Sequence, residues 1–266
     1  MKYKLGIIGG GNMGAAIVRG CIAAGVLKPS DFIIAEIDAR KRSQLEALHV
    51  PTSAATSAVL AADQILLAIK PQVFADIAKA IVPLPASKIV ISIMAGPESA
   101  AIRRALGGEA RILRAMPNMA CQIGAGMTAI AMGAGAQAGD EAQVQAVFNA
   151  LGKTVLIDES LIPAVTAVSG SGPAYVFALA AAMQEAAREL DIDQSTARVL
   201  VEQTIVGSGR LLDELGRGAA DLQRAVTSPG GTTAAALEVM GKNEFQRIMI
   251  AALTAARDRA VELGGK

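Results

Sequence analysis

The sequence predicts an α/β fold in which a doubly wound parallel sheet is followed by an all-α region. Strand patterns alternate with helix patterns as far as about residue 158, which is typical of a sheet with helices on both faces. A glycine-rich loop follows the first strand. From Ser160 onward, apolar and small residues recur only at helical spacing. We therefore expect one domain at 1–158 and a second, helical domain at 159–266.

The first strand and helix frame a nucleotide-binding loop. Lys4 to Ile8 reads as a buried strand and 15–24 as an apolar helix, with a G-x-G-x-x-G motif between them. Gly9 would make the tight turn, Gly11 would admit a pyrophosphate, and Gly14 would allow close helix–strand packing. The first domain is thus expected to be Rossmann-type, with a cofactor held by Gly9, Gly11, Asn12, Met13 and Gly14.

The second strand, 31–37, ends where the ribose of a dinucleotide is normally recognised. Glu36 lies about twenty residues after the glycine motif, where an acidic residue binds the 2′-hydroxyl of NAD. Asp38 is a second candidate. Arg40, with Lys41 and Arg42 after it, could instead hold the 2′-phosphate of NADP, although such a basic run also suits a solvated helix start. The choice between NADH and NADPH stays open.

Three further strands end in small or polar residues. The expected strands are 64–69, 88–94 and 111–115, with edge strands at 123–132 and 154–157 and helices at 56–61, 73–81, 98–106 and 141–151. Ligands of such sheets bind at the carboxyl ends of the strands. Each segment alone could be a routine turn, but together they predict a nicotinamide pocket formed by Ala68, Ile69, Lys70, Pro71, Ala95, Gly96 and Met116-Pro117-Asn118.

The helical region is expected to pair with a second copy of the chain. A long helix at 161–190 is interrupted by Ser169-Gly170-Ser171-Gly172-Pro173, Asp193 caps the next helix, and 244–263 closes the chain. Several of these helices are apolar or small on most faces, which needs more partners than one small domain supplies. A homodimer through the C-terminal helices is the simplest source, and burial against the first domain is the alternative.

A turn that becomes a helix is the candidate substrate site. Ser228-Pro229-Gly230-Gly231 cannot continue a helix, whereas Thr232 and Thr233 can cap and start one. Such a helix N-terminus, with small residues and hydroxyls, suits a carboxylate. An ordinary capped loop is the alternative.

Composition excludes several classes of function. The net charge of +1 favours neither nucleic acid nor an anionic membrane, and apolar runs such as 65–69 are too short to span a bilayer. The two cysteines fit no metal spacing and no disulfide framework, so we expect no metal and a cytoplasmic setting.

The usual acid–base residues of dehydrogenases are absent from the helical region. The single histidine, His49, falls in the second helix of the first domain, and no lysine occurs between Lys153 and Lys242. A ketone or alcohol substrate would need a proton donor or acceptor. An iminium ion already carries its proton and needs only orientation.

Five motifs occur in the order and spacing of one enzyme family. They are 9–14, Ala68-Ile69-Lys70-Pro71, Arg114-Ala115-Met116-Pro117-Asn118, Ser169-Gly170-Ser171-Gly172-Pro173-Ala174-Tyr175 and Thr227-Ser228-Pro229-Gly230-Gly231-Thr232-Thr233. Over essentially its whole length the chain resembles the pyrroline-5-carboxylate reductases.

The resemblance implies NAD(P)H-dependent reduction of L-1-pyrroline-5-carboxylate to L-proline, the last step of proline biosynthesis. It implies that the backbone around Ser228, Gly231 and Thr232 holds the substrate carboxylate and that the Thr233 hydroxyl meets the ring nitrogen. The 169–173 segment, with Ser171, would shape the substrate pocket, and Ala68, Lys70, Pro71, Ala95 and Asn118 would line the cofactor. Intertwined C-terminal helices would form a dimer, often assembled into a decamer.

Two positions depart from the family pattern. Glu36 stands where many relatives carry a small or hydroxylated residue that accepts a 2′-phosphate, and Ala55 stands where some carry Asn.

Two other functions are weighed against the reductase. A β-hydroxyacid-dehydrogenase-like oxidoreductase would need a lysine in the long helix after residue 170, and the sequence has none there. A non-catalytic nucleotide-binding assembly protein would leave the 228–233 turn unexplained.

Overall fold

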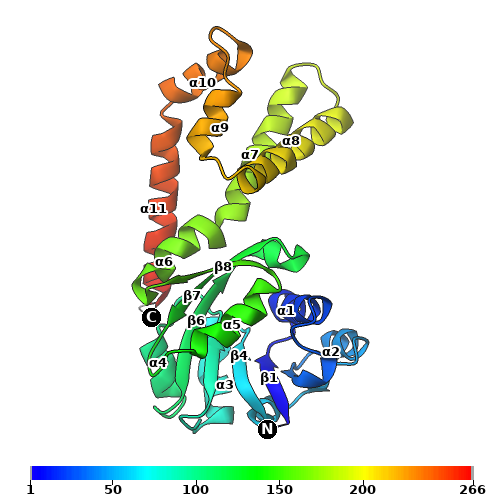
Figure 1. Cartoon of the computed structure of the whole chain (residues 1–266), viewed down its shortest axis with the longest axis vertical. Coiled ribbons are helices and arrows are strands. Elements are labelled where there is room, and N and C mark those ends of the chain that lie inside the picture. Colours follow the sequence, from blue (N-terminus) through cyan, green and yellow to red (C-terminus); the bar gives the residue numbers. More distant parts are fainter. Residues whose placement is uncertain (1, 265–266) are drawn as a thin grey trace. The chain divides into compact units, whose positions relative to one another are not determined.

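The computed structural model describes residues 2–264 as two compact units. The first comprises Met1–Ser171 together with Thr254–Lys266, and the second comprises Gly172–Leu253. The first unit contains the whole sheet, and the second contains only helices (Figure 1).

An eight-stranded sheet in the order β3-β2-β1-β4-β5-β6-β7-β8 forms the first unit. The pairs from β3 to β6 are parallel, β7 runs antiparallel to β6, and β8 is parallel to β7. Strand order reverses between β1 and β4, so the carboxyl ends of these two strands are where a doubly wound sheet binds its ligand. The strands are β1 (Tyr3–Ile8), β2 (Phe32–Ala35), β3 (Thr52–Ser53), β4 (Ala62–Leu67), β5 (Ile89–Ser92), β6 (Arg111–Pro117), β7 (Gly126–Met132) and β8 (Gly152–Ile157).

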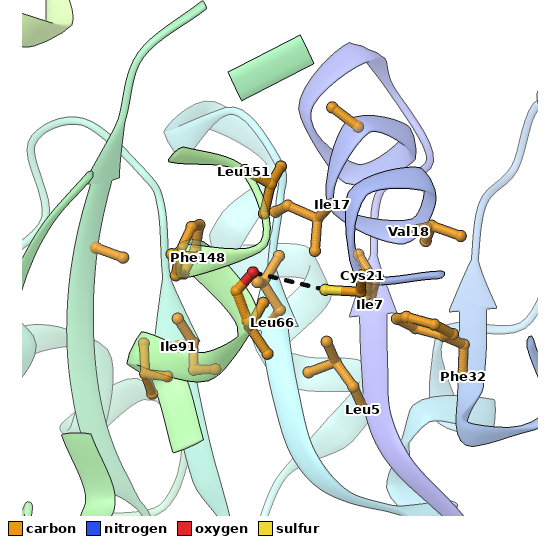
Figure 2. Close-up of a cluster of buried hydrophobic side chains, with 14 of the residues drawn as sticks. Leu5, Ile7, Ile17, Val18, Cys21, Phe32, Leu66, Ile91, Phe148 and Leu151 are labelled. Carbon is orange, nitrogen blue, oxygen red and sulfur yellow. Dashed lines mark hydrogen bonds between the residues drawn. The ribbon is translucent and has the colours of Figure 1, made fainter. Parts of the chain in front are cut away.

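Helices cover both faces of the sheet because alternate strand residues point to opposite sides. Ile7 and Ile91 pack in one buried cluster with α1 and α5, whereas Ile8 and Val90 pack in another with α3 and α4. Figure 2 shows the first of these clusters, in which Cys21 of α1 lies among side chains that include Ile7 and Phe32. The helices of this unit are α1 (Asn12–Ala23), α2 (Ala39–Glu46), α3 (Phe74–Ile81), α4 (Ser99–Ala105), α5 (Asp140–Asn149) and α6 (Ile162–Val165).

The second unit consists of helices that bury little of their own surface. Two residues of α8, Ala197 and Val201, are buried, whereas α7, α9, α10 and α11 contain no buried residue in the described chain. Large apolar side chains such as Phe177 and Ile248 are about 60% exposed. An apolar face of this extent is typical of a protein–protein interface. These helices are α7 (Gly172–Glu189), α8 (Gln194–Glu214), α9 (Ala219–Ala225), α10 (Thr232–Lys242) and α11 (Phe245–Gly264), of which the last ends in the first unit.

One stretch of the described chain, Glu159–Glu189, is long and apolar enough to cross a membrane by length and composition. It has a mean hydropathy of 1.3 in its most apolar window. The apolar helix of a soluble assembly passes the same test, so this is weak evidence for a membrane.

The alternation of strands and helices is confirmed, with four corrections. The expected edge strand 123–132 is β7, an inner strand that begins after the short helix Met119–Ile123. The two-residue edge strand β3 and helix α9 were not anticipated. His49 lies after α2 rather than within it, in an exposed position with φ of 58°.

Candidate active site

The glycine loop after β1 has the geometry that each of its glycines was predicted to provide. Gly9 has φ of 102°, and a Cβ there would lie 2.4 Å from the Ala68 carbonyl oxygen. A Cβ at Gly14 would lie 2.1 Å from the Gly9 carbonyl oxygen. At Gly11 a Cβ would meet nothing within 4 Å. The open face of the loop is therefore at Gly11, the N-cap of α1.

The start of α1 fits the pyrophosphate of a dinucleotide. No side chain caps this helix, and its first backbone hydrogen bond is the one that Ala15 donates to Gly11. The N–H groups of Asn12, Met13 and Gly14 are thus available to an anion beside Gly11, where the helix dipole adds a partial positive charge.

Glu36 follows β2 and is part of the loop structure. Its carboxylate accepts hydrogen bonds from the backbone N–H of Gly10 (2.8 Å) and of Asp38 (2.9 Å). The side chain is nearly buried. Glu36 therefore braces the glycine loop, and each of its oxygens keeps a second lone pair that could accept a ribose hydroxyl.

The basic residues after β2 divide into two roles. Arg42 donates to the carbonyl oxygens of Glu36 and Ile37, both at 2.9 Å, and so holds the loop. Asp38 caps α2, and the N–H of Arg40 holds the pKa of that carboxyl below its usual range. Arg40 and Lys41 line a cavity of about 400 Å³ together with Arg19 of α1 and with Asp38, whose carboxylate lies 4.0 Å from Arg40 Nε. Its other lining residues include Gly10, Gly11, Asn12 and Gln44.

Arg19 was missed by the sequence analysis. It lies in the second half of α1, a helix whose pattern was interpreted only for its small and apolar residues. Its exposed position opposite the apolar face of α1 was the signal that could have identified it. Arg19, Arg40 and Lys41 give this cavity three cationic side chains.

The predicted nicotinamide residues come together at one edge of the sheet. Because β4, β5 and β6 are adjacent and parallel, Ala68, Gly96 and Asn118 follow carboxyl ends at the same edge. The Ala68 N–H bonds to the Ile8 carbonyl, which ties this edge to the glycine loop. Asn118 accepts a hydrogen bond from the Met127 N–H at 3.2 Å and thereby fixes the turn after β6. Ile69, Lys70, Pro71 and Ala95 lie in the same turns.

A π-helical turn, Thr166–Gly170, overlaps the start of the Ser169–Pro173 segment. The Ser171 N–H donates to the Thr166 carbonyl at 2.8 Å, and the Ser169 hydroxyl donates to the Val165 carbonyl at 3.2 Å. The predicted interruption of the long helix is therefore confirmed, as a wide turn of the kind often found at functional sites.

The turn before α10 differs from the prediction in its cap. Gly231, not Thr232 or Thr233, is the N-cap, and no side chain caps the helix. The reason is that the Gly231 N–H closes the turn on the Ser228 carbonyl (3.0 Å), with Gly230 at φ of 68°. Thr232 and Thr233 become the first two helical residues, and neither hydroxyl bonds to another described residue. The N–H groups and hydroxyls are thus left for a ligand.

Neither cysteine of the chain is an activated nucleophile. Burial raises the pKa of Cys21 to about 12 and also raises that of Cys121, so both stay thiols. Residues 2–264 contain no group of three His, Cys, Asp or Glu side chains that could hold a metal.

Comparisons with known proteins agree over the full length of the chain. Residues 159–263 match the family described as pyrroline-5-carboxylate reductase dimerisation, and residues 4–96 match that described as NADP oxidoreductase, coenzyme F420-dependent. A Synechocystis pyrroline-5-carboxylate reductase is 37% identical, with 100% of both chains covered. The chain belongs to the pyrroline-5-carboxylate reductase family.

Solved structures of this family have the same fold. A reductase from Coxiella burnetii has a TM-score of 0.91 at 34% identity, and one from Plasmodium falciparum with NADP bound has 0.87 at 27% identity; each comparison covers 99% of both chains. The chain is accordingly an NAD(P)-dependent oxidoreductase with a C-terminal dimerisation domain. Membership favours the reductase over the two other functions weighed above.

Two glycine substitutions should separate the stability of the loop from its ligand binding. Gly14→Ala places a methyl group against the Gly9 carbonyl and should lower the melting temperature of the protein without cofactor. Gly11→Ala meets no atom of the chain and should leave that temperature unchanged, but should weaken NADPH binding at least tenfold by occupying the open face. Thermal unfolding and titration calorimetry measure the two effects, and equal NADPH affinity in wild type and Gly11→Ala would place the pyrophosphate elsewhere.

Proposed function

We propose that this chain reduces L-1-pyrroline-5-carboxylate to L-proline with NADPH or NADH, the last step of proline biosynthesis. The observation that carries the proposal is the full-length similarity to named reductases, at 37% identity over both complete chains. The open glycine loop and the uncapped turn before α10 support it from the geometry.

The cofactor residues are proposed in two groups. Gly9, Gly11, Asn12, Met13 and Gly14 hold the pyrophosphate, and Glu36 and Arg40 meet the adenosine ribose. Ala68, Ile69, Lys70, Pro71, Ala95, Gly96 and Asn118 form the nicotinamide wall. When bound, reduced nicotinamide supplies the hydride.

The substrate residues are proposed on the turn before α10 and on the π-helical turn. The N–H groups of Thr232 and Thr233 lie at a helix N-terminus, where a carboxylate is stabilised by the dipole, and Gly231 is the N-cap beside them. Ser228, Gly230 and Ser171 complete the substrate set. The Thr233 hydroxyl accepts the N–H of the protonated imine and holds the ring in place.

This assignment explains why no strong acid or base is needed. Hydride adds to the carbon of C=N⁺, the π electron pair moves to nitrogen, and a neutral amine results. No proton has to be supplied in that step, so orientation of the ring is the contribution required of the protein.

Removing the Thr233 hydroxyl should slow the reaction without loosening the cofactor. A hydrogen bond to a charged group is worth about 1.5–3 kcal/mol, and about 1.4 kcal/mol corresponds to tenfold. Thr233→Val should therefore lower kcat/KM for the imine by about 10- to 100-fold, with NADPH affinity nearly unchanged. Thr204→Val is the matched control, because the Thr204 hydroxyl is already bonded to the Leu200 carbonyl at 2.7 Å. An unchanged kcat/KM in Thr233→Val would show that the ring nitrogen binds elsewhere.

We propose that the protein uses both cofactors, with Glu36 favouring NADH and Arg40 favouring NADPH. The Glu36 carboxylate would repel a 2′-phosphate, whereas Arg19, Arg40 and Lys41 line the cavity beside it and would attract one.

Substitutions of these two residues should move the cofactor preference in opposite directions. Glu36→Gln keeps an oxygen for the Gly10 N–H but removes the charge, so it should raise the NADPH/NADH ratio of kcat/KM. Arg40→Ala should lower that ratio. Loss of nicotinamide absorbance with pyrroline-5-carboxylate measures both ratios. A ratio that neither substitution changes would mean that the ribose is recognised by other residues, and no turnover of the wild type with either cofactor would contradict the proposed reaction itself.

The domain limits 1–158 and 159–266 are proposed with the functions of cofactor binding and of substrate binding with oligomerisation. The match of 159–263 to the dimerisation family supports the second.

We further propose a cytoplasmic homodimer through the C-terminal helices, assembled into a decamer, without a nucleic-acid or membrane partner. Light scattering of the purified protein should give the mass of a decamer, and a monomer mass would contradict the role given to the exposed faces of α7 and α8.

A further inference from the structure

One carboxylate, that of Glu159, joins three segments of the first unit that are distant in sequence. Its Oε1 accepts the backbone N–H of Ser99 (2.8 Å) and lies 3.3 Å from Arg114 Nη1, and its Oε2 accepts the Ser99 hydroxyl. The Ser99 hydroxyl oxygen in turn accepts the Ala134 N–H at 2.9 Å. Glu159 thus holds α4, β6 and the segment after β8 together.

Each of these segments leads directly to a part of the candidate site. Ser99 begins α4, one residue after the Ala95-Gly96-Pro97 turn. Arg114 lies on β6, which ends at Pro117 before Asn118. Glu159 precedes α6 and the π-helical turn that ends at Gly170, next to Ser171. The same carboxylate is therefore connected to two nicotinamide turns and to one substrate turn.

The contact is partly enclosed, unlike an ordinary surface ion pair. The Arg114 side chain is 5% exposed and that of Glu159 is 25% exposed. Ser99 is buried, and Arg114 Nε has no hydrogen-bond partner in residues 2–264. Glu159 is the carboxylate that neutralises Arg114, and a buried charge without its partner is costly, so the three segments cannot separate easily.

Apolar contacts also join β6 to α6 and to the π-helical turn. Met116 of β6 is buried in a small cluster with Ala131 and Ile162, against which Ala95 and Val165 pack. A Cβ at Gly170 would lie 3.6 Å from Met116 Cε. Displacement of the segment that follows β8 would therefore also displace the end of β6 and the turn after β5, because their side chains pack together.

We infer that Glu159 is a positioning residue for hydride transfer, acting through the Ala95-Gly96 turn, the end of β6 and the Ser169–Ser171 turn. The inference depends on the proposed roles of those turns. Glu159 touches neither cofactor nor substrate in this account. It fixes the relative position of the backbone segments that hold them, and displacement of reacting atoms by about 1 Å can cost about a hundredfold in rate.

Single-turnover kinetics of Glu159→Gln test the inference, with Glu98→Gln as the matched control. Glu98 is an exposed carboxylate that lines the same cavity as Glu159, and its side chain makes no hydrogen bond or ion pair to a described residue. Protein loaded with NADPH is mixed with pyrroline-5-carboxylate, and nicotinamide absorbance is followed through the first turnover. The rate constant measures positioning within each folded site, and the amplitude measures the fraction of folded sites.

We expect Glu159→Gln to lower the rate constant at least tenfold with an unchanged amplitude, and Glu98→Gln to change neither. A reduced amplitude with an unchanged rate constant would show that Glu159 is merely structural and would overturn the inference. Should Glu159→Gln fail to fold, Ser99→Ala replaces it, because that change removes the hydroxyl bond between α4 and Glu159 while keeping the backbone N–H bond and the Arg114 ion pair.

A second measurement does not depend on the reaction. In hydrogen exchange, Glu159→Gln should speed exchange at the start of α4 and in 162–171 relative to Glu98→Gln. Unchanged exchange there would overturn the connection even if turnover falls. If the wild-type protein showed no turnover, the proposed function would be contradicted. The exchange result would then still decide whether Glu159 connects α4 with residues 162–171.

Discussion

The candidate cofactor site depends on a contact that only glycine permits, between the ends of β1 and β4. The Gly9 backbone lies so close to the Ala68 carbonyl that a side chain could not be accommodated, and Gly14 lies equally close to Gly9. These two approaches turn the chain from β1 into α1 at the point where strand order reverses. They leave Gly11 and the first N–H groups of α1 facing open space, and Glu36 braces the loop through the Gly10 N–H.

The helical unit is under the opposite constraint, since it has almost no core of its own. Four of its five helices bury no residue in the described chain, and their large apolar side chains remain exposed. A second copy is the partner that the match to a dimerisation family indicates. Because the turn at 228–233 lies in this unit, the proposed substrate site and the assembly depend on the same helices, and stability should depend on protein concentration.

Most of the fold could be predicted from local patterns, but contacts between distant residues could not. The period-2 strands and the spacing of Gly9, Gly11 and Gly14 identify the Rossmann-type half. Strand direction has no comparable signal, so the antiparallel β7 was missed. The cap of α10 was assigned to threonines because side-chain propensity favours them, whereas the Gly231–Ser228 turn determines it. Glu159 and Ser99 are 60 positions apart, and no sequence pattern connects them.

The central claim is that this fold delivers a hydride to the carbon of a cyclic imine. The most direct measurement is transfer of deuterium from NADPH labelled at C4 of the nicotinamide ring. The purified protein should convert pyrroline-5-carboxylate into proline that carries the label at C5, as detected by NMR. Folded protein that binds NADPH but forms no labelled proline would contradict the account.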